Sequence, residues 1–347
     1  MRYNYATLKD FGTKVLIAAG LTEEEAAITA ENLLFADARG IGSHGMSRLI
    51  NYSKRVKCGV IASNVDIRVE QESESALLID GQNGVGAKIA METMKLCCSK
   101  AAKTGCCIAA VHNGNHFGAG AFYSGYAAEH NMIAIVSSNS EAAVVPIGGT
   151  VPMLGTNPLS VAVPAGRHAD MNLDMATSVA ARGKVVLAQK EGHDIPEGWA
   201  VDKNGMPTTD PSAVLDGGSM LPFGGPKGYA ISLFIDLMAS CLGGALNGRQ
   251  THHFWTDYEN PQDVGYFMIV IDPSKLLPVQ TFLDRVDSAF DEFKNSPVAP
   301  DVKSVMIPGE IESNRQIVSM KEGIELPDAV VEELRRVGEE YGVPAAF

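Results

Sequence analysis

The first sixty residues carry apolar side chains at the spacing of amphipathic helices. These side chains recur at helical intervals over residues 7–19, which predicts a helix there. Thr22 and Glu25 then form the T-x-x-E pattern of a capping box, so a second helix is predicted from this point to about Arg39. A third helix is expected over residues 45–57. The amino-terminal part of the chain is therefore predicted to be helical.

From about residue 65 the pattern changes to short runs rich in Val, Ile and Ala that alternate with helix-length segments. The predicted strands are residues 76–80, 107–111, 133–138, 159–163 and 267–271. The predicted helices between them are residues 87–103, 119–130, 179–190 and 229–242. This alternation predicts an α/β core. The chain then returns to an amphipathic helix that starts at Pro327 and ends near Tyr341.

Length and charge limit the possible functions. A chain of 347 residues exceeds the usual size of a single core, so we expect two or more lobes with a ligand cleft between them. The formal net charge of −13, without a basic stripe, argues against nucleic acid as a partner. The amino terminus lacks the features of a secretory signal, so we expect a cytoplasmic protein. The longest apolar run, residues 229–246, has Asp236 near its middle and is predicted to be a buried helix rather than a membrane span.

The cysteines and histidines do not show the spacing of a metal site. None of the six cysteines belongs to a C-x-x-C pair, and we expect all of them to be reduced packing residues. They are Cys58, Cys97, Cys98, Cys106, Cys107 and Cys241. The adjacent His252 and His253 point in different directions, which suits surface or interface positions. No bound metal is expected.

Gly84 and Gly86 form a G-x-G between a predicted strand and a predicted helix, as in a dinucleotide-binding turn. Position 89 is Ile rather than Gly, and residues 100–107 offer no carboxylate for a ribose. We interpret these glycines as an ordinary tight turn. A nicotinamide cofactor would not bind through the common Rossmann arrangement.

Two histidine-containing segments have the residue types for acid/base chemistry. On a helix, His44, Arg48 and Tyr52 would lie at i, i+4 and i+8 and share one face. An imidazole can exchange protons near neutral pH, and a guanidinium can bind both oxygens of a carboxylate. His116 lies in a loop with three glycines after the strand ending at Val111, where α/β proteins tend to place sites. The alternatives are a solvated helix face for the first segment and a capped loop for the second.

Two further segments are rich in turn residues. Residues 137–158 contain short polar side chains and glycines that suit a polar ligand, although such stretches are also typical of turns. Lys227 lies in a glycine-rich turn before an apolar helix. A lysine there can meet a phosphate at the positive end of the helix, or it can simply belong to a surface turn.

Taken together, these segments resemble the malate/L-lactate dehydrogenase family that is unrelated to the Rossmann-type lactate and malate dehydrogenases. That family also includes ureidoglycolate dehydrogenases, 2,3-diketogulonate reductases, sulfolactate dehydrogenases and piperideine-2-carboxylate reductases. The matching blocks follow the family's order over nearly the whole chain. They are residues 36–45 (ADARGIGSHG), 115–118 (NHFG), 146–149 (PIGG), 154–158 (LGTNP), 173–177 (LDMAT), 199–202 (WAVD) and 225–229 (GPKGY).

The resemblance implies an α/β fold with α+β character. Its nicotinamide-binding lobe would be built on a largely antiparallel, non-Rossmann sheet over residues 73–289, with an inserted helical segment. Residues 1–72 and 290–347 would form a helical dimerisation lobe, and a homodimer would complete the cleft. The expected activity is that of an NAD-dependent, or NADP-dependent, 2-hydroxy acid dehydrogenase acting on a small carboxylic acid.

The resemblance also implies roles for single residues. His44 and His116 would lie at the substrate, where one of them acts as the acid/base, and Arg48 would hold the carboxylate. The other expected substrate-binding residues are Ser43, Tyr52, Thr156 and Asn157. The expected cofactor-binding residues are Ser140, Asp174, Met175, Ala176, Lys227, Gly309 and Glu310. The alternatives are a ureidoglycolate or other 2-hydroxy acid dehydrogenase, a reductase of cyclic 2-imino acids, and a non-catalytic binder of small molecules.

Overall fold

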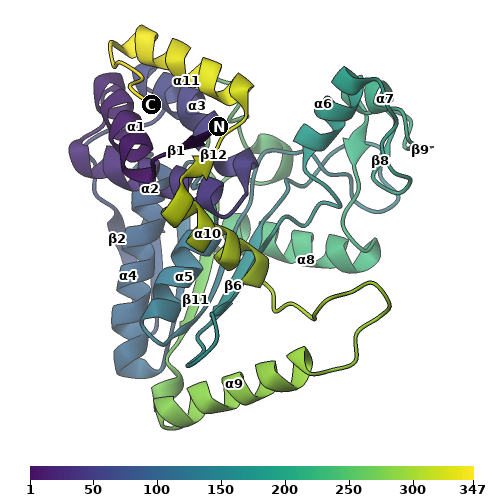
Figure 1. Cartoon of the computed structure of the whole chain (residues 1–347). Helices are drawn as coiled ribbons and strands as arrows, with labels where there is room; N and C mark the ends of the chain where they lie inside the picture. The colour runs from purple at the N-terminus through teal and green to yellow at the C-terminus, as the bar shows by residue number, and fades with distance from the viewer.

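A seven-stranded, mostly antiparallel sheet forms the centre of the computed structural model, which describes residues 1–347 (Figure 1). The strand order is β2-β3-β4-β11-β5-β6-β7, and only β3 and β4 pair in parallel. The strands are β2 (Arg68–Glu72), β3 (Ala76–Asp80), β4 (Cys106–Gly114), β5 (Ile133–Ser138), β6 (Leu159–Val163), β7 (Met171–Met175) and β11 (Val264–Ile271). The predicted α/β core and its largely antiparallel sheet are confirmed.

Strand β11 fills the middle of this sheet, between β4 and β5. Its sequence VGYFMIVI is a nearly continuous apolar run because the strand is hydrogen-bonded on both edges and covered on both faces. Helices α4 (Gly86–Thr104) and α5 (Ala121–Glu129) cover one face of the sheet, and α8 (Pro226–Leu237) lies against the other (Figure 1). The sheet therefore has a helix layer on each side.

The two chain termini build a helical region beside the sheet (Figure 1). Its core of 23 buried residues joins residues 8–61 to residues 324–337, with Val85 and Phe254 from the sheet region. The elements are β1 (Arg2–Tyr3), α1 (Tyr5–Ala19), α2 (Glu23–Ala38), α3 (Leu49–Lys57), β12 (Ile324–Glu325) and α11 (Asp328–Tyr341). The predicted capping box at the start of α2 is present, with Thr22 and Glu25 bonding each other's backbone N–H groups.

A smaller region between β7 and β11 of the chain has its own core of nine buried residues, two of which, Val144 and Leu154, come from the segment between β5 and β6. It contains α6 (Arg182–Glu191), β8 (Ala200–Val201), β9 (Pro207–Thr208), α7 (Pro211–Leu215) and β10 (Ser219–Met220). Two more helices, α9 (Val279–Lys294) and α10 (Glu310–Glu322), lead from the sheet back to the terminal helices. The division of the chain at residues 72 and 289 stays a prediction, and β2 pairs with β3 in the central sheet.

The third predicted helix is wrong in its first part. Residues 42–48 form two short 3-10 turns, and α3 begins only at Leu49. The backbone is extended at Gly45, and the Asp37 carboxylate accepts the N–H of Met46 at 2.7 Å. A Cβ atom at position 45 would overlap that carboxylate, so the chain bends here instead of continuing as a helix.

The predicted helix over residues 229–242 is α8 followed by a π turn, Met238–Leu242, and its predicted burial holds for one face only. Phe234 and Leu242 are more than half exposed, although the Phe234 ring lies 6.3 Å, centroid to centroid, from Phe267 of β11. No helix of the structure combines the length and hydropathy that a membrane crossing requires. All six cysteines are free, as expected, but Cys58, Cys106 and Cys241 are exposed rather than packed in the core.

Candidate active site

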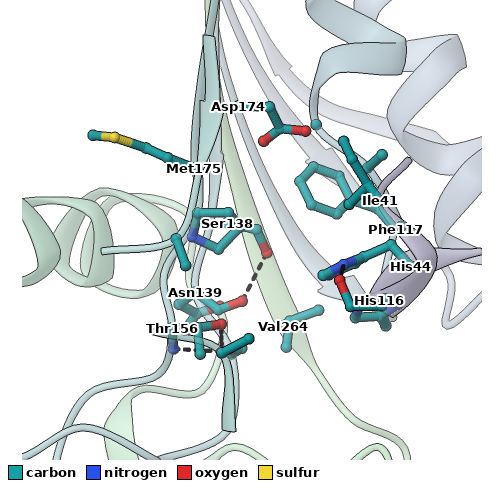
Figure 2. A pocket seen from close by; sticks show the side chains of 18 of the residues that line it. Ile41, His44, His116, Phe117, Ser138, Asn139, Thr156, Asp174, Met175 and Val264 are labelled. Carbon is teal, nitrogen blue, oxygen red and sulfur yellow. Dashed lines mark hydrogen bonds between the residues drawn. The ribbon is translucent and has the colours of Figure 1, made fainter. Parts of the chain in front are cut away.

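A cleft of about 230 Å³ lies between the turns at residues 41–44, the loop after β4 and the ends of β5 to β7. Figure 2 shows His44 and His116 on one side of the cleft, with Asn139 and Thr156 across from them. The two predicted histidine segments, far apart in the sequence, therefore meet at one cavity.

The His116 ring is held through its Nδ1 atom. The Tyr52 hydroxyl lies 2.6 Å from Nδ1 and 3.1 Å from the carbonyl oxygen of the same residue. A single hydroxyl proton can serve both contacts only if Nδ1–H donates to the Tyr52 oxygen while the hydroxyl donates to the carbonyl. That arrangement places the proton on Nδ1 and leaves Nε2 as the free acceptor. We expected Tyr52 beside the substrate, whereas the structure buries it against His116.

The loop that carries His116 is fixed by aromatic stacking. Phe117 stacks between Tyr123 and Tyr266, with ring centroids 5.2 Å and 5.0 Å away. The hydroxyls of these tyrosines donate to the carbonyl oxygens of Phe117 and Asn115. This loop therefore has little freedom to move before a ligand binds.

Two glycines let other elements approach this loop closely. A Cβ atom at Gly118 would overlap the Asn32 side-chain oxygen, which accepts the Ala119 N–H at 3.1 Å. Gly86 starts α4 directly against the His116 carbonyl, and a Cβ atom there would overlap this oxygen. The G-x-G of residues 84–86 is thus a tight turn with a packing role.

His44 lies parallel to His116, with ring centroids 5.6 Å apart and planes 18° apart. Its Nδ1 atom is 2.9 Å from the hydroxyl of Ser43, which also lines the cleft. Burial and the nearby Arg48 lower the pKa of His44 to about 4. Burial, His44 and Arg48 together hold the pKa of His116 well below its usual range. Both imidazoles are therefore neutral at pH 7 in the ligand-free protein.

Arg48 lies close to both imidazoles, although it is not among the residues that line the cleft. Its Nε donates to the Ser43 carbonyl at 2.6 Å, which leaves the two terminal amino groups without a protein partner. The guanidinium lies over the Trp255 ring at 4.3 Å from the centroid. A half-buried guanidinium with unpaired donors can bind a carboxylate. Arg48 thus has free donors near the imidazoles, and it belongs to a 3-10 turn rather than to a helix face.

The sequence did not indicate that residues 251–262 pack against His116 and Arg48, and of this segment only Gln262 lines the cleft. The fully buried Arg55 donates to the backbone carbonyls of His253, Phe254, Asp257 and Asn260 and so fixes this segment. As a result the Phe254 ring packs 4.7 Å from His116, and the Trp255 ring lies edge-on at 6.0 Å. These contacts join residues that are far apart in the chain, which no local pattern reveals.

Ser140, Thr156 and Asn157 come together across the cleft from the imidazoles. The Ser140 hydroxyl accepts the Thr156 N–H at 3.1 Å, and the Ser140 N–H donates to the Asn157 side chain at 3.2 Å. Ser140 and Thr156 line the cleft, as expected for residues that contact a ligand. Asn157 is fully buried and donates to the Ser232 carbonyl at 3.1 Å, so its position indicates a structural role.

Of the expected cofactor-contacting residues, Ser140, Asp174, Met175 and Ala176 line the cleft. Asp174 accepts the Ala121 N–H at 2.9 Å, and burial raises its pKa to about 6. Lys227, Gly309 and Glu310 lie outside this lining. Lys227 is exposed, and Glu310 is paired with Lys294 at 2.6 Å. No three His, Cys, Asp or Glu side chains converge where they could hold a metal ion.

The lining of the cleft fits a nicotinamide. Apolar side chains from Ile41 and Val264 can contact a flat ring, while Ser140 and Thr156 offer hydroxyls to its polar substituents. The cleft continues from the imidazoles to Asp174, so an elongated ligand can reach both ends (Figure 2). Val264, Thr156 and Ser140 would be among the residues that hold the cofactor.

The comparisons with known proteins agree with this site. The profile of the family described as malate/L-lactate dehydrogenase matches residues 3–335. The chain belongs to this family. It is therefore an oxidoreductase of the dehydrogenase type, and its family works with a nicotinamide cofactor.

Similar proteins cover almost the whole chain. The malate/(S)-sulfolactate dehydrogenase of Methanothermus fervidus is 40% identical over 330 residues, which is 95% of each chain. The solved structure of sulfolactate dehydrogenase from Methanocaldococcus jannaschii superposes with a TM-score of 0.93 at 37% identity and covers 99% of this chain and 98% of that one. The structure of delta1-piperideine-2-carboxylate reductase from Pseudomonas syringae has a TM-score of 0.88 at 31% identity, covering 97% and 99%. The resemblance inferred from the sequence is confirmed.

Proposed function

We propose that this protein is an NAD-dependent 2-hydroxy acid dehydrogenase and 2-oxo acid reductase of the malate/lactate type. The observation that carries the proposal is the pair of stacked imidazoles on the cleft with an unpaired guanidinium beside them. When bound, the nicotinamide supplies or accepts the hydride at carbon 2 of the acid. The chain itself provides the carboxylate grip and the proton.

In this proposal Arg48 binds the carboxylate of the acid. The bound acid then has its carbon 2 directed toward the place of the nicotinamide in the cleft. His116 is the acid/base, because its Nδ1 is fixed by the buried Tyr52 and only Nε2 remains for the substrate oxygen. In the oxidative direction the neutral Nε2 removes the hydroxyl proton, and in the reductive direction the imidazolium returns it. His44 stacks on this ring and closes the cleft beside it.

Binding of the acid and protonation of His116 are coupled. The positive charge of Arg48 contributes to the low pKa of both imidazoles. A bound carboxylate neutralises that charge, so the pKa of His116 rises when the acid binds. Reduction should therefore accelerate as the pH falls, and oxidation should accelerate as the pH rises.

We propose NAD rather than NADP as the preferred cofactor. Asp174 offers a carboxyl partner to ribose hydroxyls, and no lysine or arginine lines the cleft to bind a 2′-phosphate. Similar proteins use either cofactor. They include an NAD(+)-dependent ureidoglycolate dehydrogenase and an NADP(+)-dependent sulfolactate dehydrogenase. Steady-state rates with each cofactor decide between them.

The proposed function is tested by a screen of about a dozen 2-oxo acids with each reduced cofactor. Wild-type protein should oxidise the cofactor with at least one acid, and His116→Ala should lower turnover about a hundredfold or more. His44→Ala should have a smaller effect. Near-normal turnover in both variants would refute this acid/base assignment.

A reductase of cyclic 2-imino acids is the second candidate, because the piperideine-carboxylate reductase shares this fold. It would need the same carboxylate grip. Including a cyclic imino acid in the screen separates the two, since the preferred substrate is the one with the higher kcat/KM. No absorbance change with any acid would favour a non-catalytic binder.

We also propose that the chain forms a homodimer. Helix α10 exposes four apolar side chains, and apolar side chains grouped on one surface element indicate a partner. They are Ile311, Ile317, Val318 and Met320, which are 42% to 66% exposed. Light scattering on purified protein should give twice the chain mass, and Ile317→Glu should shift it toward the mass of one chain. A monomeric wild-type protein would refute the proposal.

A further inference from the structure

We propose that Trp255 and Arg55 are positioning residues for the group that binds the carboxylate of the acid. Trp255 supports the Arg48 guanidinium from one side, and Arg55 holds Trp255 in its place. Neither Trp255 nor Arg55 lines the cleft, so both act through Arg48 and do not touch the substrate. The inference rests on the proposed function, in which Arg48 binds the carboxylate.

The Arg48 guanidinium is held at two places. Its Nε donates to the Ser43 carbonyl at 2.6 Å, and its central carbon lies over the Trp255 ring at 4.3 Å from the centroid. A cation over the face of an aromatic ring is attracted by it, and the attraction is strongest with tryptophan. The hydrogen bond and the ring together restrict the rotation of the guanidinium. Its two terminal amino groups are therefore oriented before the acid binds.

Trp255 belongs to residues 252–260, a segment that Asp257 closes on itself. The Asp257 carboxylate accepts the backbone N–H and the side-chain amide of Asn260 at 3.0 Å and 3.1 Å. The same carboxylate lies 2.9 Å from a ring nitrogen of His252. These contacts tie both ends of the segment to one side chain, so we expect the segment to move as a unit.

Arg55 attaches this segment to helix α3. Its side chain is fully buried, and all of its acceptors are backbone carbonyl oxygens of the segment. One acceptor, at 3.4 Å, is the carbonyl of Phe254, which leads directly into Trp255. The Nε atom of Arg55 is buried without a hydrogen-bond partner, which costs stability. What the guanidinium gains is a fixed position of the segment against α3.

Helix α3 joins the two ends of this arrangement. Arg48 directly precedes the helix, and Arg55 follows seven residues later, so both side chains lie on one side of the helical path. A shift of the segment against α3 would therefore move the indole away from the Arg48 guanidinium. The Trp255 ring also lies edge-on to His116, but at 6.0 Å, so we expect the larger effect on Arg48.

Trp255→Leu and Trp255→Phe test the support of Arg48. Leucine removes the ring, whereas phenylalanine keeps an aromatic face for the cation. In Trp255→Leu we expect the KM for the acid to rise about three- to thirtyfold, with kcat changed less than about threefold. Trp255→Phe should keep a KM for the acid within about threefold of wild type. The KM for the reduced cofactor should stay unchanged in both variants.

Trp199→Leu is the matched control for Trp255→Leu. Trp199 also has a cation over its ring, Lys184 at 5.8 Å, but it packs in the smaller region and does not line the cleft. This control should keep the KM for the acid of the wild-type protein. An equal rise in KM in the two leucine variants would overturn the inference.

Arg55→Lys tests the attachment of the segment, because a single ammonium cannot reach four carbonyl groups at once. We expect the KM for the acid to rise as it does in Trp255→Leu. In the double variant the KM should be at most about threefold above that of the worse single variant, because Arg55 acts through Trp255. Effects that multiply in the double variant would overturn this link. Arg55→Gln serves the same test if the lysine variant does not fold.

Two measurements test the arrangement without turnover. Calorimetric titration of the cofactor-loaded protein with oxamate, a 2-oxo acid analogue, should give a Kd about three- to thirtyfold higher in Trp255→Leu than in the wild-type protein. The chain has two tryptophans, so Trp199→Phe leaves Trp255 as the only indole emitter. In that background, Arg55→Lys should shift the emission to longer wavelength and lower its anisotropy.

The outcomes separate this inference from the proposed function. If the wild-type protein reduces 2-oxo acids but Trp255→Leu keeps the wild-type KM for the acid and Kd for oxamate, the inference is overturned and the proposed function stands. Unchanged Trp255 emission in Arg55→Lys overturns the role of Arg55. If the wild-type protein reduces no acid, the proposed function fails. In that case weaker oxamate binding in Trp255→Leu supports the inference, and equal or absent binding overturns it.

Discussion

The hydroxyl of Tyr52 offers the sharpest test of how the acid/base is oriented. Tyr52→Phe removes one oxygen atom and preserves the ring that packs against Phe254, with centroids 5.1 Å apart. The substitution leaves Nδ1 of His116 and its carbonyl oxygen without the partner that they have at 2.6 Å and 3.1 Å. The imidazole would then be free to place its proton on Nε2, where the oxidation of a hydroxy acid needs an acceptor.

The magnitude follows from the cost of unpaired buried groups. A buried polar group that loses its only partner costs about 1–3 kcal/mol. Without Tyr52 the imidazole must recover the form with its proton on Nδ1 before Nε2 can accept the substrate proton. If this recovery costs about 1–3 kcal/mol, turnover falls by about 5- to 150-fold, since about 1.4 kcal/mol corresponds to a factor of ten. The free energy of unfolding should also fall by about 1–3 kcal/mol, because the same contacts exist in the ligand-free protein.

Tyr5→Phe is the matched control for this experiment. The Tyr5 hydroxyl donates to Glu31 at 2.6 Å in the terminal helices, away from the cleft. Both variants should be less stable in urea, but only Tyr52→Phe should lose turnover in the oxidative direction. Equal kcat values for the two variants, measured at saturating acid and cofactor, would refute the orienting role of Tyr52.

Three further predictions concern Arg48, Gly118 and Asp37. Arg48→Lys should raise the KM for the acid about ten- to a hundredfold with a smaller effect on kcat, as measured in initial-rate assays, because a lysine cannot bind both oxygens. Gly118→Ala should lower the free energy of unfolding by about 2 kcal/mol or more, since φ is +79° and the new Cβ atom would overlap a buried amide. Gly183→Ala is the matched control, because Gly183 lies in helix α6 and no atom lies within 4 Å of the new Cβ. Urea unfolding should show this variant to be as stable as the wild-type protein or more stable. Burial raises the pKa of Asp37 to about 7, above its usual 3.8, so the folded protein binds the extra proton and stability falls as the pH rises from about 4 to 7. In Asp37→Asn the free energy of unfolding should change less between about pH 4 and pH 7 than in the wild-type protein. Urea midpoints that fall with pH as steeply as those of the wild-type protein would contradict this prediction.

The regular elements could be predicted because their signals are local. The capping box of Thr22 and Glu25 places the start of α2, and the apolar runs of β3, β5 and β6 give their bounds to the residue. Strand β2 was missed because its sequence RVEQE is polar and every residue in it is exposed. An edge strand of this kind has no buried face to mark it.

The candidate site was predictable only in part. The segments with His44 and His116 were found, but the helical spacing of His44 and Arg48 was wrong because the Asp37 carboxylate bends the chain at Gly45. The Gln262 side chain accepts the His116 N–H and so joins residues 146 positions apart in the sequence. Such pairs are selected by the tertiary fold, and no periodicity or motif indicates them.

The central place of β11 has a consequence for the order in which the chain can fold. Strands β4 and β5 are both synthesised long before the strand that joins them. Until residues 264–271 leave the ribosome, each of these strands has an open edge facing the gap. The terminal helices must wait longer still, because their core needs residues 324–337. A nascent chain of this protein therefore remains open to mispairing until synthesis is nearly complete, and its cleft is among the last parts to form.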